Sequence, residues 1–175
     1  MVTAKIPPIP WHTPALWQAA NAGVRQSMAR HHHHSGPAID AAKAIQRDFS
    51  AIFPTLNALC NATCPSCTAI CCQKARIWAD FKDLVFYHLA GITPPDQQPV
   101  SHPGDRCRYS TASGCRLERL QRPFVCTWYL CPAQTALLKC YPDEGNSLKK
   151  ILVQIQKARR RMEDDFIQML QSSLH

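Results

Sequence analysis

The sequence is poor in glycine and in charge, and it lacks long apolar runs. Only six of its 175 residues are glycine, against fourteen prolines, and charged residues make up 18% of the chain. No apolar stretch reaches the roughly 18 residues that a transmembrane helix needs. The first seventeen residues hold four prolines and no basic segment followed by an apolar run. We therefore expect no secretory signal, no membrane segment and a cytoplasmic protein.

Common enzyme motifs are also missing from the sequence. It has no glycine-rich phosphate loop, no Ser-His-Asp arrangement and no HExxH motif. The formal net charge is +8 with neutral thiols. Each site of four thiolates and one Zn²⁺ removes two positive charges, so two such sites would leave about +4. The charge is thus weak evidence for nucleic acid, and we expect a protein or redox partner of unknown identity instead.

The apolar residues, 46% of the chain, recur mostly at helical spacing and predict a mainly α fold. We expect a small helical domain around a cysteine-ligated metal cluster, with long proline-rich loops, one of them over residues 92–114. Residues 1–36 form an N-terminal arm and helix, and residues 37–175 form the cysteine-cluster domain. The expected helices cover residues 14–30, 37–58, 72–90 and 146–174, with further helical turns after Pro123 and Pro132.

Ten cysteines stand out against these absences, and they fall into two groups along the chain. The first group is Cys60, Cys64, Cys67, Cys71 and Cys72, and the second is Cys107, Cys115, Cys126, Cys131 and Cys140. Close spacing lets one turn present two sulfurs to one ion. Cys71 and Cys72 lie at a predicted helix start, where the helix dipole favours the thiolate that binds metal.

Two other interpretations of the cysteines remain beside metal binding. One or two of them could be small buried apolar residues, but five within thirteen positions do not arise from core packing alone. A disulfide framework fits poorly, because the cytosol keeps thiols reduced and no signal peptide is present. At least four cysteines are therefore expected to bind metal.

The second group carries a specific pattern. Cys107 is followed by Gly114-Cys115, then by the run from Arg122-Pro123 to Cys126, and then by Cys131. With the earlier run that ends in Cys71-Cys72, this resembles the YkgJ-like cysteine-cluster family, the putative zinc- or iron-chelating CxxCxxCC domain. The resemblance covers residues 60–131.

The resemblance implies eight metal ligands and no particular reaction. The ligands are Cys64, Cys67, Cys71, Cys72, Cys107, Cys115, Cys126 and Cys131. Three residues, not two, separate Cys67 from Cys71, and Cys60 and Cys140 lie outside the family pattern. Flagellin lysine methylases, which are much longer chains, carry a similar cluster.

Sulfur ligands suit both zinc and iron–sulfur clusters, and the spacings match neither a ferredoxin run nor a zinc ribbon. We favour an iron–sulfur cluster, 4Fe–4S, slightly over zinc because of the methylase resemblance and the single compact run. The expected role is structural or electron-transfer. The alternatives are a cluster-dependent enzyme, such as a protein-lysine methyltransferase, and a nucleic-acid-binding zinc module. One centre or two, and the oligomeric state, stay open.

Several further residues have both an ordinary and a functional interpretation. The row of His31, His32, His33 and His34 is interpreted as a solvated loop, with weak metal capture as the alternative. Core packing is the expected role of His88, and His102 is expected in an exposed loop. The basic last helix, with Arg159-Arg160-Arg161, is interpreted as a solvated face. Trp128 and Tyr129 are expected to shield the metal site from water, with stacking on a base or substrate as the alternative.

Overall fold

The computed structural model describes residues 8–65, 67, 71–74, 77–111 and 114–172. It is mainly α, as predicted, with one pair of very short strands. In chain order the elements are α1 (Pro14–Arg30), the 3₁₀ turn η1 (His32–His34), α2 (Gly36–Thr63), α3 (Cys71–Lys74), α4 (Phe81–Leu89), β1 (Ser110–Thr111), β2 (Gly114–Cys115), η2 (Arg119–Gln121), α5 (Phe124–Trp128), α6 (Pro132–Lys139) and α7 (Pro142–Gln171).

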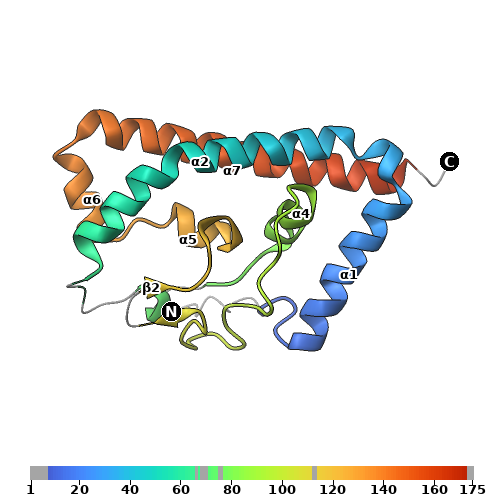
Figure 1. The fold of residues 1–175 in the computed structure, drawn as a ribbon, viewed down its shortest axis with the longest axis horizontal. Coiled ribbons are helices and arrows are strands. Elements are labelled where there is room, and N and C mark those ends of the chain that lie inside the picture. The colour runs from blue at the N-terminus through green and yellow to red at the C-terminus, as the bar shows by residue number, and fades with distance from the viewer. Residues whose placement is uncertain (1–7, 66, 68–70, 75–76, 112–113, 173–175) are drawn as a thin grey trace, which may run out of the picture.

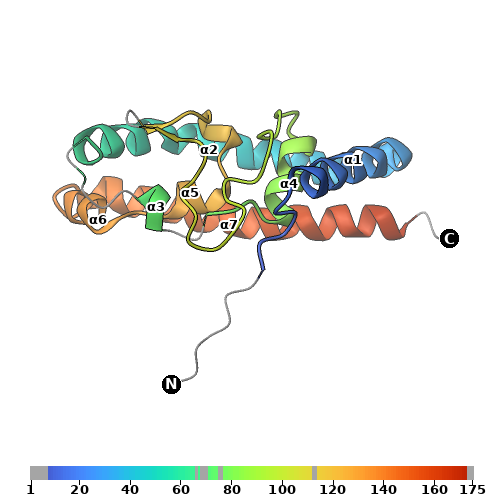
Figure 2. The same ribbon diagram turned by 90° about the horizontal axis from the view of Figure 1, so that it is seen from below.

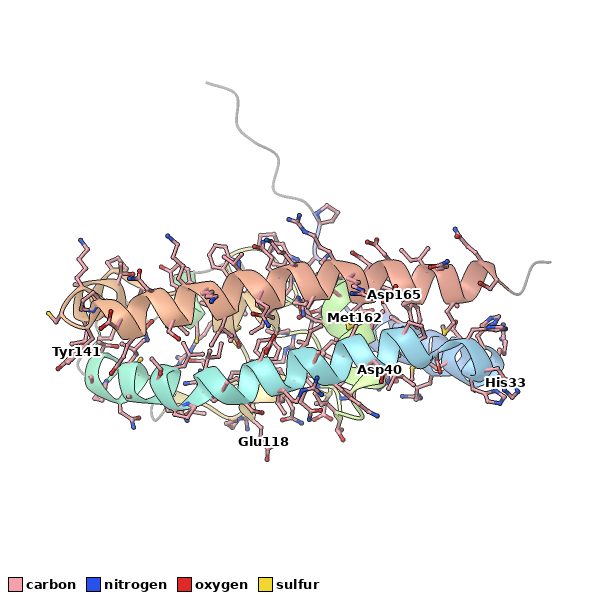
Figure 3. The ribbon with its side chains drawn as sticks, turned by 90° about the horizontal axis from the view of Figure 1, so that it is seen from above. His33, Asp40, Glu118, Tyr141, Met162 and Asp165 are labelled. Atoms are coloured by element: carbon pink, nitrogen blue, oxygen red, sulfur yellow. The ribbon has the colours of Figure 1, made fainter. Side chains whose placement is uncertain are left out.

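Two long helices, α2 and α7, run antiparallel along each other and form one side of the molecule (Figure 1). Each buries an apolar stripe at helical spacing, which makes the pair amphipathic. The buried stripe residues are Ala42, Ile45, Phe49, Ile52 and Leu56 of α2, and Leu148, Ile155, Met162, Phe166 and Met169 of α7. Met162 lies between the two helices when they are viewed from above (Figure 3). Trp17 and Val24 of α1 join the same core.

The short elements lie together beneath this helix pair (Figures 1 and 2). Helix α4 packs on α1, α2 and α7. Its end at Gly91 follows the predicted C-terminal pattern: Gly91 has a positive φ of 68°, and the N–H of Ile92 donates to the Tyr87 carbonyl over 2.7 Å. No helix in the described ranges is long and apolar enough to cross a membrane.

The two long helices extend beyond their predicted bounds. Helix α2 continues through Pro54 to Thr63, so the expectation that it ends near residue 58 and that turns begin at 59 is wrong. A proline inside a helix costs about 3 kcal/mol. Burial of Ile52, Leu56 and Leu59 on either side of it offsets that cost.

The last helix begins at Pro142 and not at residue 146. Proline suits the first helical turn, and Asp143 and Glu144 complement the helix dipole there. These signals precede the apolar stripe, which begins at Leu148, so a prediction from periodicity alone misses them. The buried position of Arg159 is a second correction, since this residue was assigned to a solvated basic face.

The predicted helix over residues 72–90 is wrong as a single element. It is divided into α3 and α4, and Ala79 between them is held in non-helical backbone by a distant side chain. The Gln98 amide accepts from the Ala79 N–H over 2.9 Å and donates to its carbonyl over 3.0 Å. Asp80 then caps α4 in a reciprocal pair with Asp83. A tertiary contact therefore overrides the local helical pattern.

Candidate metal centre

The first cysteines of the chain follow one another around the end of α2. Cys60 is in the last turn of that helix, and the N–H of Cys64 closes the turn by donating to the Cys60 carbonyl over 2.8 Å. The N–H of Cys67 then donates to the Cys64 carbonyl over 3.1 Å. Cys71 and Cys72 open α3, as the sequence predicted.

Four cysteines from distant parts of the sequence lie together, and we call them the inner cysteine group. They are Cys72, Cys107, Cys115 and Cys126. They pack around a small apolar cluster that includes Ile77, Tyr109 and Leu117. A backbone hydrogen bond of 3.1 Å from the Cys107 N–H to the Cys72 carbonyl holds the segment of Cys107 against the start of α3. The group thus combines one cysteine from the early run with three from the later one.

A short hairpin positions Cys107 and Cys115. Ser110 pairs with Cys115 in the antiparallel register of β1 and β2. Gly114 has a φ of 119°, which favours glycine over other residues and explains the Gly-Cys of the motif. The Tyr109 hydroxyl donates to the Gln97 carbonyl over 3.0 Å and so anchors the hairpin to the proline-rich loop.

Cys126 is positioned by the Arg-Pro of the same motif. The Arg122 Nε donates to the Leu117 carbonyl over 3.1 Å, and Pro123 precedes the first residue of α5. The N–H of Phe124, at the start of that helix, donates to the Asp83 carboxylate over 2.9 Å. The motif residues therefore act as supports that hold α5, and with it Cys126, against the hairpin.

A second set, the outer cysteine group, consists of Cys60, Cys64 and Cys71. Cys64 and Cys60 share a side-chain hydrogen bond, and Cys71 is close enough for its charge to act on Cys64. Cys60 was predicted to lie apart, yet two side chains donate to its sulfur: Arg119 Nη2 over 3.6 Å and Gln134 Nε2 over 3.5 Å. Its spacing of four residues before Cys64, one helical turn, is the signal that could have placed it here.

Cys71 of the outer group and Cys72 of the inner group are neighbours in the chain, and their pKa values shift in opposite directions. A hydrogen bond from the Cys72 thiol, helped by backbone N–H groups at the start of α3, lowers the pKa of Cys71 to about 6 despite burial. The same bond and burial raise the pKa of Cys72 far above its usual value. At neutral pH Cys71 is the thiolate of the pair and Cys72 is the proton donor.

Burial and neighbouring cysteines raise the pKa of Cys107 and of Cys126 in the inner group. Burial, followed by the charges of Cys107 and Cys115, raises the pKa of Cys126 well above its usual range. Burial and Cys115 likewise raise the pKa of Cys107. A bound cation would reverse this balance, because its positive charge stabilises the thiolate form over the neutral thiol.

The other predicted ligands have fewer contacts with these groups. Cys67 is half-buried, and Cys131 caps α6, where its N–H donates to Gln134 Oε1 over 3.2 Å. Cys140 is exposed, with its sulfur 3.9 Å from the Ala136 carbonyl oxygen. All ten cysteines are free. Within the described residues no three His, Cys, Asp or Glu side chains form a ready-made group for a metal ion.

The histidines lie apart from the cysteine groups. His33 is at the end of the long helix pair opposite Tyr141 (Figure 3). The 28 residues of α2, at about 1.5 Å each, place the histidine row about 40 Å from Cys60. His88 Nε2 is 2.9 Å from Asn21 Oδ1, and burial together with Arg25 lowers the pKa of His88 to about 4. It is a neutral packing residue at pH 7.

Comparisons with known proteins add no assignment to this geometry. No protein-family model matches the chain, and no curated protein and no solved structure matches it either. The resemblance to the YkgJ-like family stays a prediction from the motif residues. The function must therefore be argued from the cysteine groups themselves.

Proposed function

We propose that this chain is a metal-binding protein that holds an iron–sulfur cluster or zinc through its clustered cysteines. The role of the centre is structural or electron-transfer. One observation carries the proposal: four free cysteines from three separate segments converge as the inner group on one small apolar cluster. Four thiolates are a complete ligand set for a tetrahedral zinc ion or for one cluster.

The donor set and its supports fit such a centre. The ligands are sulfur, which zinc and iron–sulfur clusters share. Around them stand an apolar cluster and a second layer of supports, with Arg122 held on Leu117 and Phe124 held on Asp83. Ligating residues in metal sites are commonly oriented by such outer contacts. The thiols must lose protons and draw together on binding, since no three described side chains form a finished site.

The outer group offers three further sulfurs and two N–H donors beside Cys60. Three protein ligands leave a fourth position open, which is the arrangement of a site that binds a substrate or a water. This favours the second candidate, a cluster-dependent enzyme, at the outer group. The inner group suits a closed structural or electron-transfer centre. When bound, zinc would crosslink the segments, and a cluster would carry an electron.

The test is metal analysis and an absorption spectrum on protein purified without oxygen. We expect about one zinc ion, or about four iron atoms with a broad visible band, for each filled set of four thiolates. Cys126→Ser should lose the metal of the inner group, because it removes one of four ligands. The matched control is Cys140→Ser, an exposed cysteine outside both groups.

The metal analysis and the absorption spectrum together distinguish zinc from an iron–sulfur cluster. Iron with a visible band excludes zinc as the native metal, and colourless protein with zinc excludes the cluster. Protein that holds neither metal, or a Cys126→Ser variant that keeps its full metal content, contradicts the proposal.

A further inference from the structure

A cavity of about 400 Å³ lies between α4, α5 and α7. Its walls include two tryptophans, Trp78 and Trp128, and three residues of α7, Gln156, Arg159 and Arg160. Ligand cavities in proteins commonly measure 300 to 1,000 Å³ and combine apolar walls with a few polar groups, so this one has the size and lining of a binding site for a small molecule.

On the floor of the cavity, acidic and basic side chains are paired with one another. Arg159, only 2% exposed, lies with Nη1 2.8 Å from Asp83 and Nη2 3.0 Å from Asp80. Its guanidinium also lies over the Phe124 ring, 4.6 Å from the ring centroid. Lys82 lies 3.7 Å from Asp80. The two carboxylates are thus already neutralised, and the floor does not offer a free negative charge to a cationic ligand.

The rim, in contrast, presents an unpaired cation beside an open aromatic ring. In the part of the chain that the structure describes, no acidic side chain pairs with Arg160. The stretch 146–162 contains no aspartate or glutamate at all. Trp128 is 49% exposed, which is a large apolar surface to leave in water. A bound ring would cover it.

We infer that this cavity binds a small molecule that joins a planar aromatic ring to an anionic group, as a nucleotide does. The ring stacks on Trp128, and the phosphate or carboxylate pairs with Arg160. Tryptophan presents the largest stacking surface among side chains, and the arginine fork matches the geometry of phosphate and carboxylate. The Gln156 amide, one helical turn before Arg160, supplies a neutral donor and acceptor for the ring edge.

The cavity shares a wall with the inner cysteine group. Val125 lines the cavity and also packs against the apolar cluster of that group. A ligand bound here would contact Val125, the residue that precedes Cys126 in the chain. The inference goes beyond the proposed function and does not depend on it, because every group that it uses lies on α4, α5, α7 or Trp78.

A second hollow on α7 provides a way to tell binding of a small molecule from binding of a nucleic-acid strand. It lies over Asn146, Lys149, Lys150, Val153, Gln154 and Lys157. These lysines lie nearer to the start of α7 and do not line the cavity with the tryptophans. A nucleic-acid strand would need both hollows, whereas a small ligand needs Trp128 and Arg160 alone.

Calorimetric titration of the full chain tests this inference. The probes are AMP and FMN, each compared with the counterpart that lacks the charge, adenosine or riboflavin, and with inorganic phosphate, which lacks the ring. We expect at least one of the two ring-bearing anions to bind with a stoichiometry near one. Each incomplete counterpart should bind at least about tenfold more weakly, because one of the two contacts is lost.

Matched variants then locate the site. Arg160→Glu and Trp128→Ala should each raise the Kd at least about tenfold. The controls are Arg161→Glu and Tyr129→Ala, which change an arginine and an aromatic residue one position away and outside the cavity; they should change the Kd less than about twofold. All four side chains are on the surface, so these variants should fold.

Three results would overturn the inference. One is that neither AMP nor FMN binds at about 1 mM. Another is that binding persists unchanged in both cavity variants. The third is that a single-stranded oligonucleotide binds more tightly than either probe and loses affinity mainly on substitution of Lys149 and Lys150, which would assign the surface to nucleic acid. None of these results affects the metal content on which the proposed function rests.

Discussion

The helical frame and the cysteine lobe of this protein are built in different ways. The frame consists of α1, α2, α4 and α7, and it buries large apolar side chains such as Trp17, Phe86 and Phe166. The cysteine lobe, the described residues within 64–80 and 92–131, has helices of four and five residues and strands of two.

Because elements this short cannot hold themselves together, their stability must come from what they pack against or bind. The lobe's own apolar cluster is small and mixed with thiols. Apolar burial is thus sufficient to hold the frame, whereas the lobe has little apolar core of its own.

Removing the metal should have the largest effect and should separate the two regions. If the proposed centre is present, a chelator that strips it leaves the inner cysteines without the metal that crosslinks their segments, so the lobe should lose its order while the frame keeps its core. In hydrogen exchange read by mass spectrometry, protection in peptides covering 105–118 should fall about a hundredfold, against little change in 45–56. Equal loss in both regions would show that they form one cooperative unit.

Arg159 connects the two regions, and its loss should have the next largest effect. It joins α7 to Asp83 of α4 within the frame, and to Asp80 and the Phe124 ring of the lobe. Arg159→Met leaves Asp83 buried without its cation and should cost about 3–5 kcal/mol in the free energy of unfolding. Arg161→Met, at a surface pair with 81% of the side chain exposed, should cost below about 1 kcal/mol.

The pH dependence of the Arg159→Met deficit sharpens this test. Burial raises the pKa of Asp83 to about 6 in the presence of Arg159. Without the cation that pKa rises further, so protonation removes the uncompensated charge. The deficit should therefore be largest at pH 8, should shrink as the pH falls toward 6, and should level off below 6, where Asp83 is protonated in both proteins, as urea unfolding at each pH would show. A deficit that is independent of pH would mean that lost packing on Phe124, not charge, accounts for it.

The smallest expected effect lies within the frame, at His88. Burial lowers its pKa to about 4, whereas the unfolded chain takes up the proton near 6.5. The unfolded state therefore binds the proton first, and the stability that neutral His88 contributes above pH 6.5 is lost as the pH falls toward 4. His88→Asn should flatten this part of the profile of unfolding free energy against pH.

The control for His88 is His102→Asn, whose side chain is 78% exposed in the proline-rich loop. This substitution leaves His88 and Asn21 in place, so the profile should still lose stability as the pH falls toward 4. Equal slopes in wild type and His88→Asn would show that the neutral form of His88 does not account for the loss of stability in acid.

The frame was more predictable than the lobe because its signals are local. The apolar stripes of α1, α2 and α7 repeat every three or four residues, and Gly91 indicates in the sequence where α4 ends. The break between α3 and α4 was missed because it depends on Gln98, which lies nineteen residues beyond Ala79. No local pattern contains that contact.

For the candidate centre, the sequence singled out the cysteines but grouped them by position in the chain. The fold pairs Cys72 with Cys107, Cys115 and Cys126, and it brings Cys60 to Cys64 and Cys71. Trp128 was expected to shield the centre, yet it opens onto a cavity. Metal ligation by Cys67 and Cys131 stays a prediction.

The sequence by itself determined a mainly helical frame, the helix start at Cys71-Cys72, and the motif residues around Cys126. Those features follow from side-chain periodicity and from backbone preferences within a few residues. Only the tertiary structure decided which sulfurs meet, that Arg159 is buried and that a cavity adjoins the inner group. Each of these depends on segments that are distant in the chain, and their approach is fixed by burial of the shared core and by single hydrogen bonds such as Cys107 to Cys72.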